Sequence, residues 1–364
     1  MKDIFNIEDY NIKLWERNTF KDCAPLRDGY TYFGGKRGEY INRISMLFPE
    51  SRFKVMLDGF MGSGVVSANF NYSGVSRNVI EYDRGTYTLN KCIQDNPTKM
   101  LQVINSIEPT LEFFNSSKEF LEYIKNLSDD DFKKNKGFDR FEVARAKYTL
   151  LTLSRDSKGE TFKKQVVSDK HTDPIERIRL QYALDKRTEN IYLKAPKIIY
   201  DCYEGWKGLN IINGSFFDNL DFLYHKENFC FIDPPYLFSK RGIYDNRKKD
   251  TGYATDVRDK EHIEFLHDLA DRIKSGKEVG KIMLCSNFEI DDNGNLLDLQ
   301  DDYYNQILLP CGFRMVVVMD KRACEAGKNG KKKRKVEVVY INYDDIRDYW
   351  HNYKYFDYKD IYKD

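Results

Sequence analysis

Four consecutive residues with the capacity for chemistry, Asp233-Pro234-Pro235-Tyr236, directly follow an apolar run over residues 228–232. The run predicts a buried strand, and ligands of open α/β sheets bind beyond the carboxyl ends of strands. Two prolines fix φ and remove two backbone donors, so the turn presents two acceptors, the Asp233 carboxylate and the Pro234 carbonyl. These acceptors could hold both hydrogens of an aromatic amine, while the Tyr236 ring offers a face for stacking.

Such a turn suits transfer of a methyl group to an amine. An adenine N6 amine is a poor nucleophile because its lone pair is delocalised into the ring. Acceptors at Asp233 and Pro234 would free the lone pair to attack a methyl sulfonium, and alignment for in-line displacement would supply the rest of the rate. The chemistry requires neither a metal nor a covalent enzyme intermediate. The motif would equally serve cytosine N4 or an RNA adenine as the acceptor. The purely structural alternative is a tight turn after a core strand.

A second apolar run, residues 53–57, leads into the loop Asp58-Gly59-Phe60-Met61-Gly62-Ser63-Gly64. Its glycines let the backbone approach a ligand closely and begin a helix. The next strand, residues 79–80, ends in Glu81-Tyr82-Asp83, where a carboxylate could bind a ribose diol. The pattern lacks a third glycine and a Walker lysine, so neither a nicotinamide cofactor nor a phosphate is predicted. The cofactor-binding residues predicted here are Asp58, Phe60, Gly62 and Gly64, together with a carboxylate from Glu81 or Asp83.

Alternation of strands and helices predicts an α/β fold around a largely parallel sheet. Residues 263–273 have apolar side chains at helical spacing, and Gly276 follows as a C-cap. A polar, basic loop joins the last two strands without a helix, which predicts an antiparallel C-terminal hairpin at one edge of the sheet. The predicted strands cover residues 53–57, 79–80, 229–232, 282–284, 315–319 and 336–341.

The stretch over residues 95–208 interrupts this alternation. It is dense in charge and in helix formers, notably over residues 111–127 and 143–153. We therefore predict a catalytic domain formed by residues 1–94 and 209–364, with an inserted, mainly helical domain at 95–208.

Overall charge excludes one class of binding protein. The net charge is only +1, so a uniformly basic nucleic-acid binder is excluded and any such contact must use local patches. The densest patch contains Lys331, Lys332, Lys333 and Arg334. The alternative is that this patch is a solvated loop without a binding role. Seven cysteines without a Cys-x-x-Cys pair indicate neither a disulfide framework nor a zinc ribbon, so we expect no metal. With no apolar leader and no long apolar run, we expect a cytoplasmic protein that does not engage a membrane.

The order of these motifs resembles that of the Dam-like (D12-class) DNA adenine-N6 methyltransferases along nearly the whole chain. The resemblance extends to a late strand ending in Ser-Asn and to a Glu-containing C-terminal strand ending in Asn-Tyr. The corresponding segments are Gly34-Gly35-Lys36, the loop at residues 60–64, Glu81-Tyr82-Asp83, the insertion, Asp233 to Tyr236, and residues 281–287 and 336–343.

The resemblance implies a Rossmann-like, S-adenosylmethionine-dependent methyltransferase sheet whose insertion recognises the target. Its expected reaction is site-specific methyl transfer to adenine N6 of a base flipped out of duplex DNA, with S-adenosylhomocysteine as product. Double-stranded DNA is then the partner, a bacterial or phage genome the source, and restriction–modification, with a cognate restriction endonuclease, a candidate context.

By the same resemblance, further residues acquire expected roles. Glu81 is expected to bind the ribose hydroxyls, with Asp83 as a substitute. Tyr32 and Lys36 join the cofactor site, to which Asp233 also contributes, and Ser215 stands where many members have an Asp that accepts from the cofactor adenine. Arg155 and Lys158 would contact DNA. A catalytically inactive homologue that only binds DNA is the alternative from another class, and the intact Asp233 and glycine loop argue against it.

Overall fold

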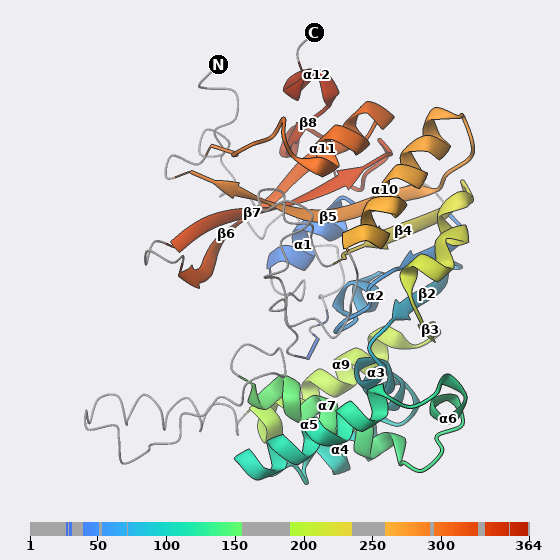
Figure 1. Ribbon diagram of the computed structural model, residues 1–364, viewed down its shortest axis with the longest axis vertical. Helices are drawn as coiled ribbons and strands as arrows, with labels where there is room; N and C mark the ends of the chain where they lie inside the picture. The colour runs from blue at the N-terminus through green and yellow to red at the C-terminus, as the bar shows by residue number, and fades with distance from the viewer. Residues whose placement is uncertain are drawn as a thin grey trace, which may run out of the picture.

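A mixed α/β architecture built on one eight-stranded sheet emerges from the computed structural model (Figure 1). The structure describes residues 27, 29–30, 39–50, 53–70, 72–154, 190–234, 259–291, 295–326, 332–348 and 350–362.

The strand order is β3-β2-β1-β4-β5-β7-β6-β8. Strands β1 to β5 are parallel, whereas β7 pairs antiparallel with both β5 and β6, and β8 pairs antiparallel with β6. The predicted largely parallel sheet and C-terminal hairpin are therefore confirmed. The strands are β1 (Val55–Asp58), β2 (Ser76–Glu81), β3 (Leu209–Asn213), β4 (Asn228–Ile232), β5 (Lys281–Ile290), β6 (Arg314–Ala326), β7 (Lys332–Ile341) and β8 (Lys354–Phe356).

One detail of the hairpin prediction was wrong. The hairpin was expected at the edge of the sheet, but β8 pairs with the outer side of β6 and is the terminal strand. β8 has only three residues, which is typical of an edge strand and gives little periodicity in the sequence.

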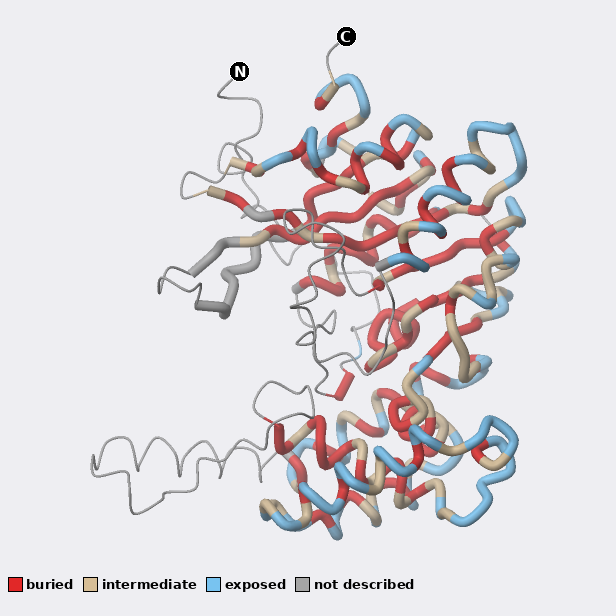
Figure 2. The backbone as a smooth tube through the Cα atoms, in the orientation of Figure 1, coloured by how far each residue is buried: buried red, intermediate tan, exposed pale blue. Residues whose placement is uncertain are grey.

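The sheet is buried on both faces, as parallel sheets usually are. Alternate residues of each strand point to opposite sides, so Phe229 and Phe231 enter one core while Cys230 and Ile232 enter the other. Helices α1 (Glu39–Met46) and α2 (Val65–Asn69) cover the first face. Helices α10 (Asp259–Lys274) and α11 (Tyr303–Leu308) cover the second. Figure 2 shows the resulting buried centre, with most of the exposed residues on the helices and turns.

Between β2 and β3 the described chain is helical, and these helices gather below the sheet (Figure 1). They share a core with the β2 and β3 side of the sheet. The predicted helices at 111–127 and 143–153 correspond to α5 and α7, and Gly276 (φ +70°) ends α10 as predicted. The helices are α3 (Arg84–Asp95), α4 (Pro97–Ile104), α5 (Leu111–Lys125), α6 (Asp129–Lys133), α7 (Arg140–Leu153), a π-helix (Asn190–Lys194) and α9 (Ala195–Trp206).

Helix α9 lies inside the predicted insertion yet packs on α2, a helix of the sheet. Trp206 is fully buried, and its indole Nε1–H donates to the Gly64 carbonyl at 3.1 Å. The boundaries at 95 and 208, and a role of this segment in target recognition, stay predictions.

Close approach of α9 and α2 requires a glycine. A Cβ at Gly205 would lie 2.6 Å from the Ala68 Cβ and 2.9 Å from its Cα. We expect Gly205→Ala to lower the free energy of unfolding by about 1–3 kcal/mol, because overpacking outweighs the gain in helix propensity. Chemical denaturation measures this. Gly214→Ala, which adds a methyl where no atom lies within 4 Å, is the control and should unfold like the wild type. Equal stability of both variants would mean that α2 and α9 can separate freely.

Candidate cofactor and amine site

Both chemistry-bearing turns lie at the topological switch point of the sheet. The chain leaves β1 for β2 on one side, while β4 pairs on the other side, and ligands of open α/β sheets bind where the strand order reverses in this way. Asp58 is the last residue of β1, and Asp233 directly follows β4. The Gly59 N–H donates to the Phe231 carbonyl at 2.9 Å, which joins the two turns although they are far apart in sequence.

The glycine loop is held in left-handed backbone conformations, with φ +52° at Gly62 and +63° at Gly64. Only glycine adopts these values at no steric cost. The Gly62 carbonyl accepts from the Tyr30 hydroxyl and from Asn90 Nδ2, both at 3.0 Å. The Tyr30 hydroxyl also lies 2.7 Å from Asn90 Oδ1, and both side chains are buried. These two residues shape the loop and were not predicted; an asparagine among the apolar positions of α3 was the available signal.

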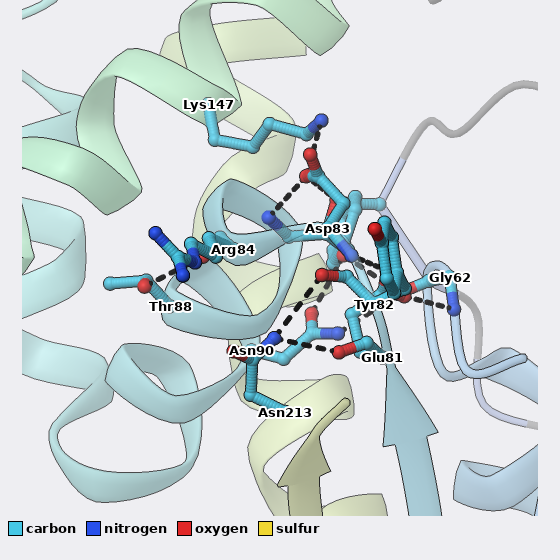
Figure 3. Close-up of polar contacts among 11 residues, drawn as sticks. Gly62, Glu81, Tyr82, Asp83, Arg84, Thr88, Asn90, Lys147 and Asn213 are labelled. Carbon is cyan, nitrogen blue, oxygen red and sulfur yellow. Dashed lines mark hydrogen bonds and ion pairs between the residues drawn. The ribbon is translucent and has the colours of Figure 1, made fainter. Parts of the chain in front are cut away.

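Glu81, at the end of β2, points toward the glycine loop (Figure 3). Its Oε2 accepts from the Gly62 N–H and its Oε1 from the Asp83 N–H, both at 2.9 Å. The side chain is only 6% exposed. Burial, together with the negative charge of Asp83, raises the pKa of Glu81 to about 8. Because hydrogen bonds favour the charged form of a carboxyl, a ligand that donates hydrogen bonds to Glu81 would favour its ionised form.

Asp83, the predicted substitute for Glu81, is already engaged in the structure. As N-cap of α3 it accepts from the Thr86 N–H at 2.7 Å, and it forms an ion pair with Lys147 at 2.7 Å. Burial opposes ionisation, but the Lys147 charge and the Thr86 hydrogen bonds hold the pKa of Asp83 below its ordinary value. This geometry favours Glu81 over Asp83 as the residue that binds a cofactor.

Asp58 is buried and braces the turn after β1. Its Oδ2 accepts from the Ser67 hydroxyl at 2.6 Å, and its Oδ1 from the Phe60 N–H at 3.3 Å. Burial raises the pKa of Asp58 to about 6, and the nearby charge of Asp233 acts in the same direction. Two carboxylates from neighbouring strands therefore lie close together at the switch point.

Residues after β3 bring an aromatic group to the same edge. Phe60 packs on Phe216 with ring centroids 5.2 Å apart, and a Cβ at Gly59 would lie 2.6 Å from the Phe216 ring. Ser215 caps the short 3₁₀ segment that begins at Phe216, since its hydroxyl accepts from the Phe217 N–H at 3.2 Å. Gly59 and Phe216 were not among the predicted site residues.

The end of β3 is tied to the end of β2. Asn213 Nδ2 donates to the Glu81 carbonyl at 2.9 Å (Figure 3). Tyr82, next to Glu81, is 52% exposed although it is a large aromatic residue. The cofactor residues predicted from sequence on β1, β2 and β3 thus lie on one edge of the sheet.

At the Asp-Pro-Pro-Tyr turn, the structure places Asp233 half-buried and Pro234 buried after β4. The backbone of β7 begins at Lys332 and includes Lys333 and Arg334. The other predicted residues, Tyr32, Lys36, Arg155, Lys158, Pro235, Tyr236 and Lys331, lie outside the described residues.

A doubly wound sheet with a glycine loop and an acidic strand end at its switch point defines the class of α/β proteins that bind nucleoside-containing ligands. Within this class, the family model of the D12 class N6 adenine-specific DNA methyltransferases matches residues 32–308. The chain belongs to this family, as its motifs predicted, and is an enzyme that methylates adenine N6 in DNA. The match ends at α11, before the C-terminal hairpin. No curated protein matches the chain.

Within the described ranges, no helix combines the length and the apolar character that crossing a membrane requires. Among the same residues, no group of three or more His, Cys, Asp or Glu side chains could hold a metal ion.

Proposed function

We propose that this enzyme transfers the methyl group of S-adenosylmethionine to N6 of an adenine that is flipped out of duplex DNA. The observation that carries the proposal is the juxtaposition, at the switch point, of the Glu81–Gly62 contact with the Asp233-Pro234 turn. Membership in the family supports adenine N6 as the acceptor atom, and the family generally uses S-adenosylmethionine as the methyl donor.

The residues present fit S-adenosylmethionine. Each Glu81 oxygen accepts one backbone N–H and retains capacity to accept a ribose hydroxyl. We assign the exposed Tyr82 ring to stacking on the adenine and Ser215 to its polar edge. Tyr32 and Lys36 are proposed for the methionine end. When bound, the cofactor supplies an electrophilic methyl group.

Strand order supports this assignment. Along the carboxyl edge the strands run β3, β2, β1, β4, which places Ser215, Glu81, the glycine loop and Asp233 in that sequence. Adenine, ribose and methionine occur in the same order in the cofactor. The methyl group would then lie next to the turn proposed to hold the target amine.

At that turn, Asp233 and the Pro234 carbonyl hold the two amine hydrogens, and Tyr236 stacks on the base. By holding these hydrogens, Asp233 and Pro234 would free the nitrogen lone pair and aim it at the methyl carbon that S-adenosylmethionine would supply when bound, with its sulfonium sulfur as the leaving group. The methylated nitrogen then loses one proton, for which the Asp233 carboxylate is the proposed acceptor.

DNA contact is assigned to the predicted insertion at residues 95–208, through Arg155 and Lys158, and to the basic residues of the C-terminal hairpin. Replacing Lys331, Lys332, Lys333 and Arg334 by Gln should reduce the salt dependence of DNA affinity, making the negative slope of log K against log salt shallower by about 3–4. Fluorescence anisotropy from 50 to 200 mM salt measures it. A cognate restriction endonuclease stays a predicted partner.

The control for this experiment is a variant with Lys54 and Lys226 replaced by Gln. Both are exposed and precede β1 and β4, at the opposite edge of the sheet from the switch point. Its slope should equal that of the wild type. An unchanged slope in the hairpin variant would exclude the hairpin from DNA binding.

The decisive experiment incubates the enzyme with radiolabelled S-adenosylmethionine and mixed-sequence duplex DNA, or RNA of matching sequence, and separates the nucleosides after digestion. Label in N6-methyldeoxyadenosine is expected. Label in a cytosine nucleoside or in RNA alone would overturn the assignment of adenine N6 in duplex DNA as the methyl acceptor. Cofactor binding without label would favour the inactive homologue, and lack of cofactor binding would overturn the cofactor assignment.

A further inference from the structure

A lysine of the helical segment reaches the end of β2 next to the proposed ribose carboxylate. Lys147, on α7, forms an ion pair with Asp83 at 2.7 Å, and the two side chains are only 13% and 17% exposed (Figure 3). Shielding from solvent makes this pair stronger than an exposed surface pair. Asp83 is in turn bound through its own N–H to Glu81 Oε1.

The backbone of α3 leaves room for this lysine. A Cβ at Gly85 would lie 3.1 Å from Lys147 Cδ, 3.2 Å from Leu121 Cδ2 and 3.3 Å from Asp83 Oδ1. Any larger side chain at this position would press on the lysine stem. A continuous set of contacts therefore runs from Lys147 through Asp83 and Glu81 to the Gly62 N–H.

We propose that Lys147 is a positioning residue for cofactor binding, which balances the charge of Asp83 and keeps Glu81 available as a carboxylate for the ribose. The inference rests on the proposed function, since it takes Glu81 as the ribose-binding group. Without Lys147, the Asp83 charge would act on Glu81 unopposed and favour its protonated form.

The charged surroundings of Glu81 support this role. Among the described residues, Asp83 raises the pKa of Glu81 and Lys147 lowers it. The neighbouring Arg84 guanidinium turns away to the Leu127 carbonyl, 2.6 Å distant, and to Asp129. Three other polar partners of the Glu81 residue, the Gly62 N–H, the Asn213 amide and the Gly214 N–H, are uncharged.

The test measures the affinity for S-adenosylhomocysteine between pH 6 and 9.5 by calorimetry. In the wild type, affinity should rise with pH and level off near the pKa of Glu81. The pH at which the affinity levels off is called the break. Lys147→Met should move this break to higher pH and weaken binding about tenfold at pH 7.5. Asp83→Asn, which keeps a good N-cap residue, should move the break downward. Because every variant binds the same ligand, titration of the ligand itself cancels.

Shifts of the break in opposite directions in Lys147→Met and Asp83→Asn would indicate a balance of charge. A merely structural role of the two residues would lower the melting temperatures of both variants without shifting the break in opposite directions. The double variant should return the break toward the wild type. Lys91→Met, which removes an ion pair with Asp95 farther along α3, is the matched control and should change neither the break nor the affinity. A break that stays fixed in folded Lys147→Met and Asp83→Asn would overturn the inference. Wild-type enzyme that binds no S-adenosylhomocysteine would instead overturn the proposed function.

Discussion

Asp233→Ala is expected to lower turnover roughly 10²–10³-fold, because it removes a preorganised contact that strengthens as the amine becomes a nucleophile. Affinity for S-adenosylmethionine should fall far less than turnover, because the glycine loop and Glu81 stay in place although Asp233 also contributes to the cofactor site. Single-turnover methylation of duplex DNA measures the chemical step, and calorimetry measures the cofactor affinity.

Two further variants sharpen this experiment. Asp233→Asn keeps one acceptor oxygen and should retain more activity than the alanine variant. Asp221→Ala removes an exposed carboxylate from the 3₁₀ segment after β3 and should be fully active. Near-normal turnover of Asp233→Ala would show that this carboxylate does not hold the amine.

The second large effect is expected at Glu81. Glu81→Gln should weaken binding of S-adenosylhomocysteine about 10–100-fold, because hydrogen bonds to a charged group contribute about 1.5–3 kcal/mol each and the amide replaces one acceptor by a donor. Calorimetry gives the affinity directly. Glu204→Gln, an exposed glutamate on α9, should bind like the wild type.

The same residue gives cofactor binding a defined pH dependence. The pKa of Glu81 is raised to about 8 in the free enzyme, and ribose hydroxyls favour the carboxylate, so binding must release a proton below that pH. Affinity should therefore increase up to tenfold per pH unit below about pH 8 and be constant above it. In Glu81→Gln this dependence should disappear, and its persistence would assign the titration to another group.

Sequence reasoning succeeded where the chemistry is carried by adjacent residues. The Asp233-Pro234 turn and the Gly62–Gly64 loop are short motifs, and each follows an apolar run that is a strand in the structure. Their proximity could be predicted because carboxyl ends of neighbouring parallel strands share one edge. β3 was missed because its apolar residues are few and flanked by Asn210 and Asn213.

The rest depends on contacts between residues distant in the chain. Tyr30, Asn90 and Lys147 act on the site through one side chain each, from segments whose approach no local pattern reveals. The choice between Glu81 and Asp83 was partly accessible, however. An Asp directly before a helix, as Asp83 is, indicates an N-cap, and a capping carboxylate is engaged by the helix backbone rather than by a ligand.

The strand order also affects how the enzyme folds. β1 has β2 as one neighbour, but its other neighbour, β4, lies about 170 residues farther along the chain. Closing so long a loop costs conformational entropy before the pairing returns any stability, and such non-local contacts form slowly. An N-terminal fragment emerging from the ribosome would contain the glycine loop and Glu81 but not the strand that completes their edge. The site is therefore complete only once β4 has paired with β1 in the middle of the sheet, and neither half of the chain contains all of its residues.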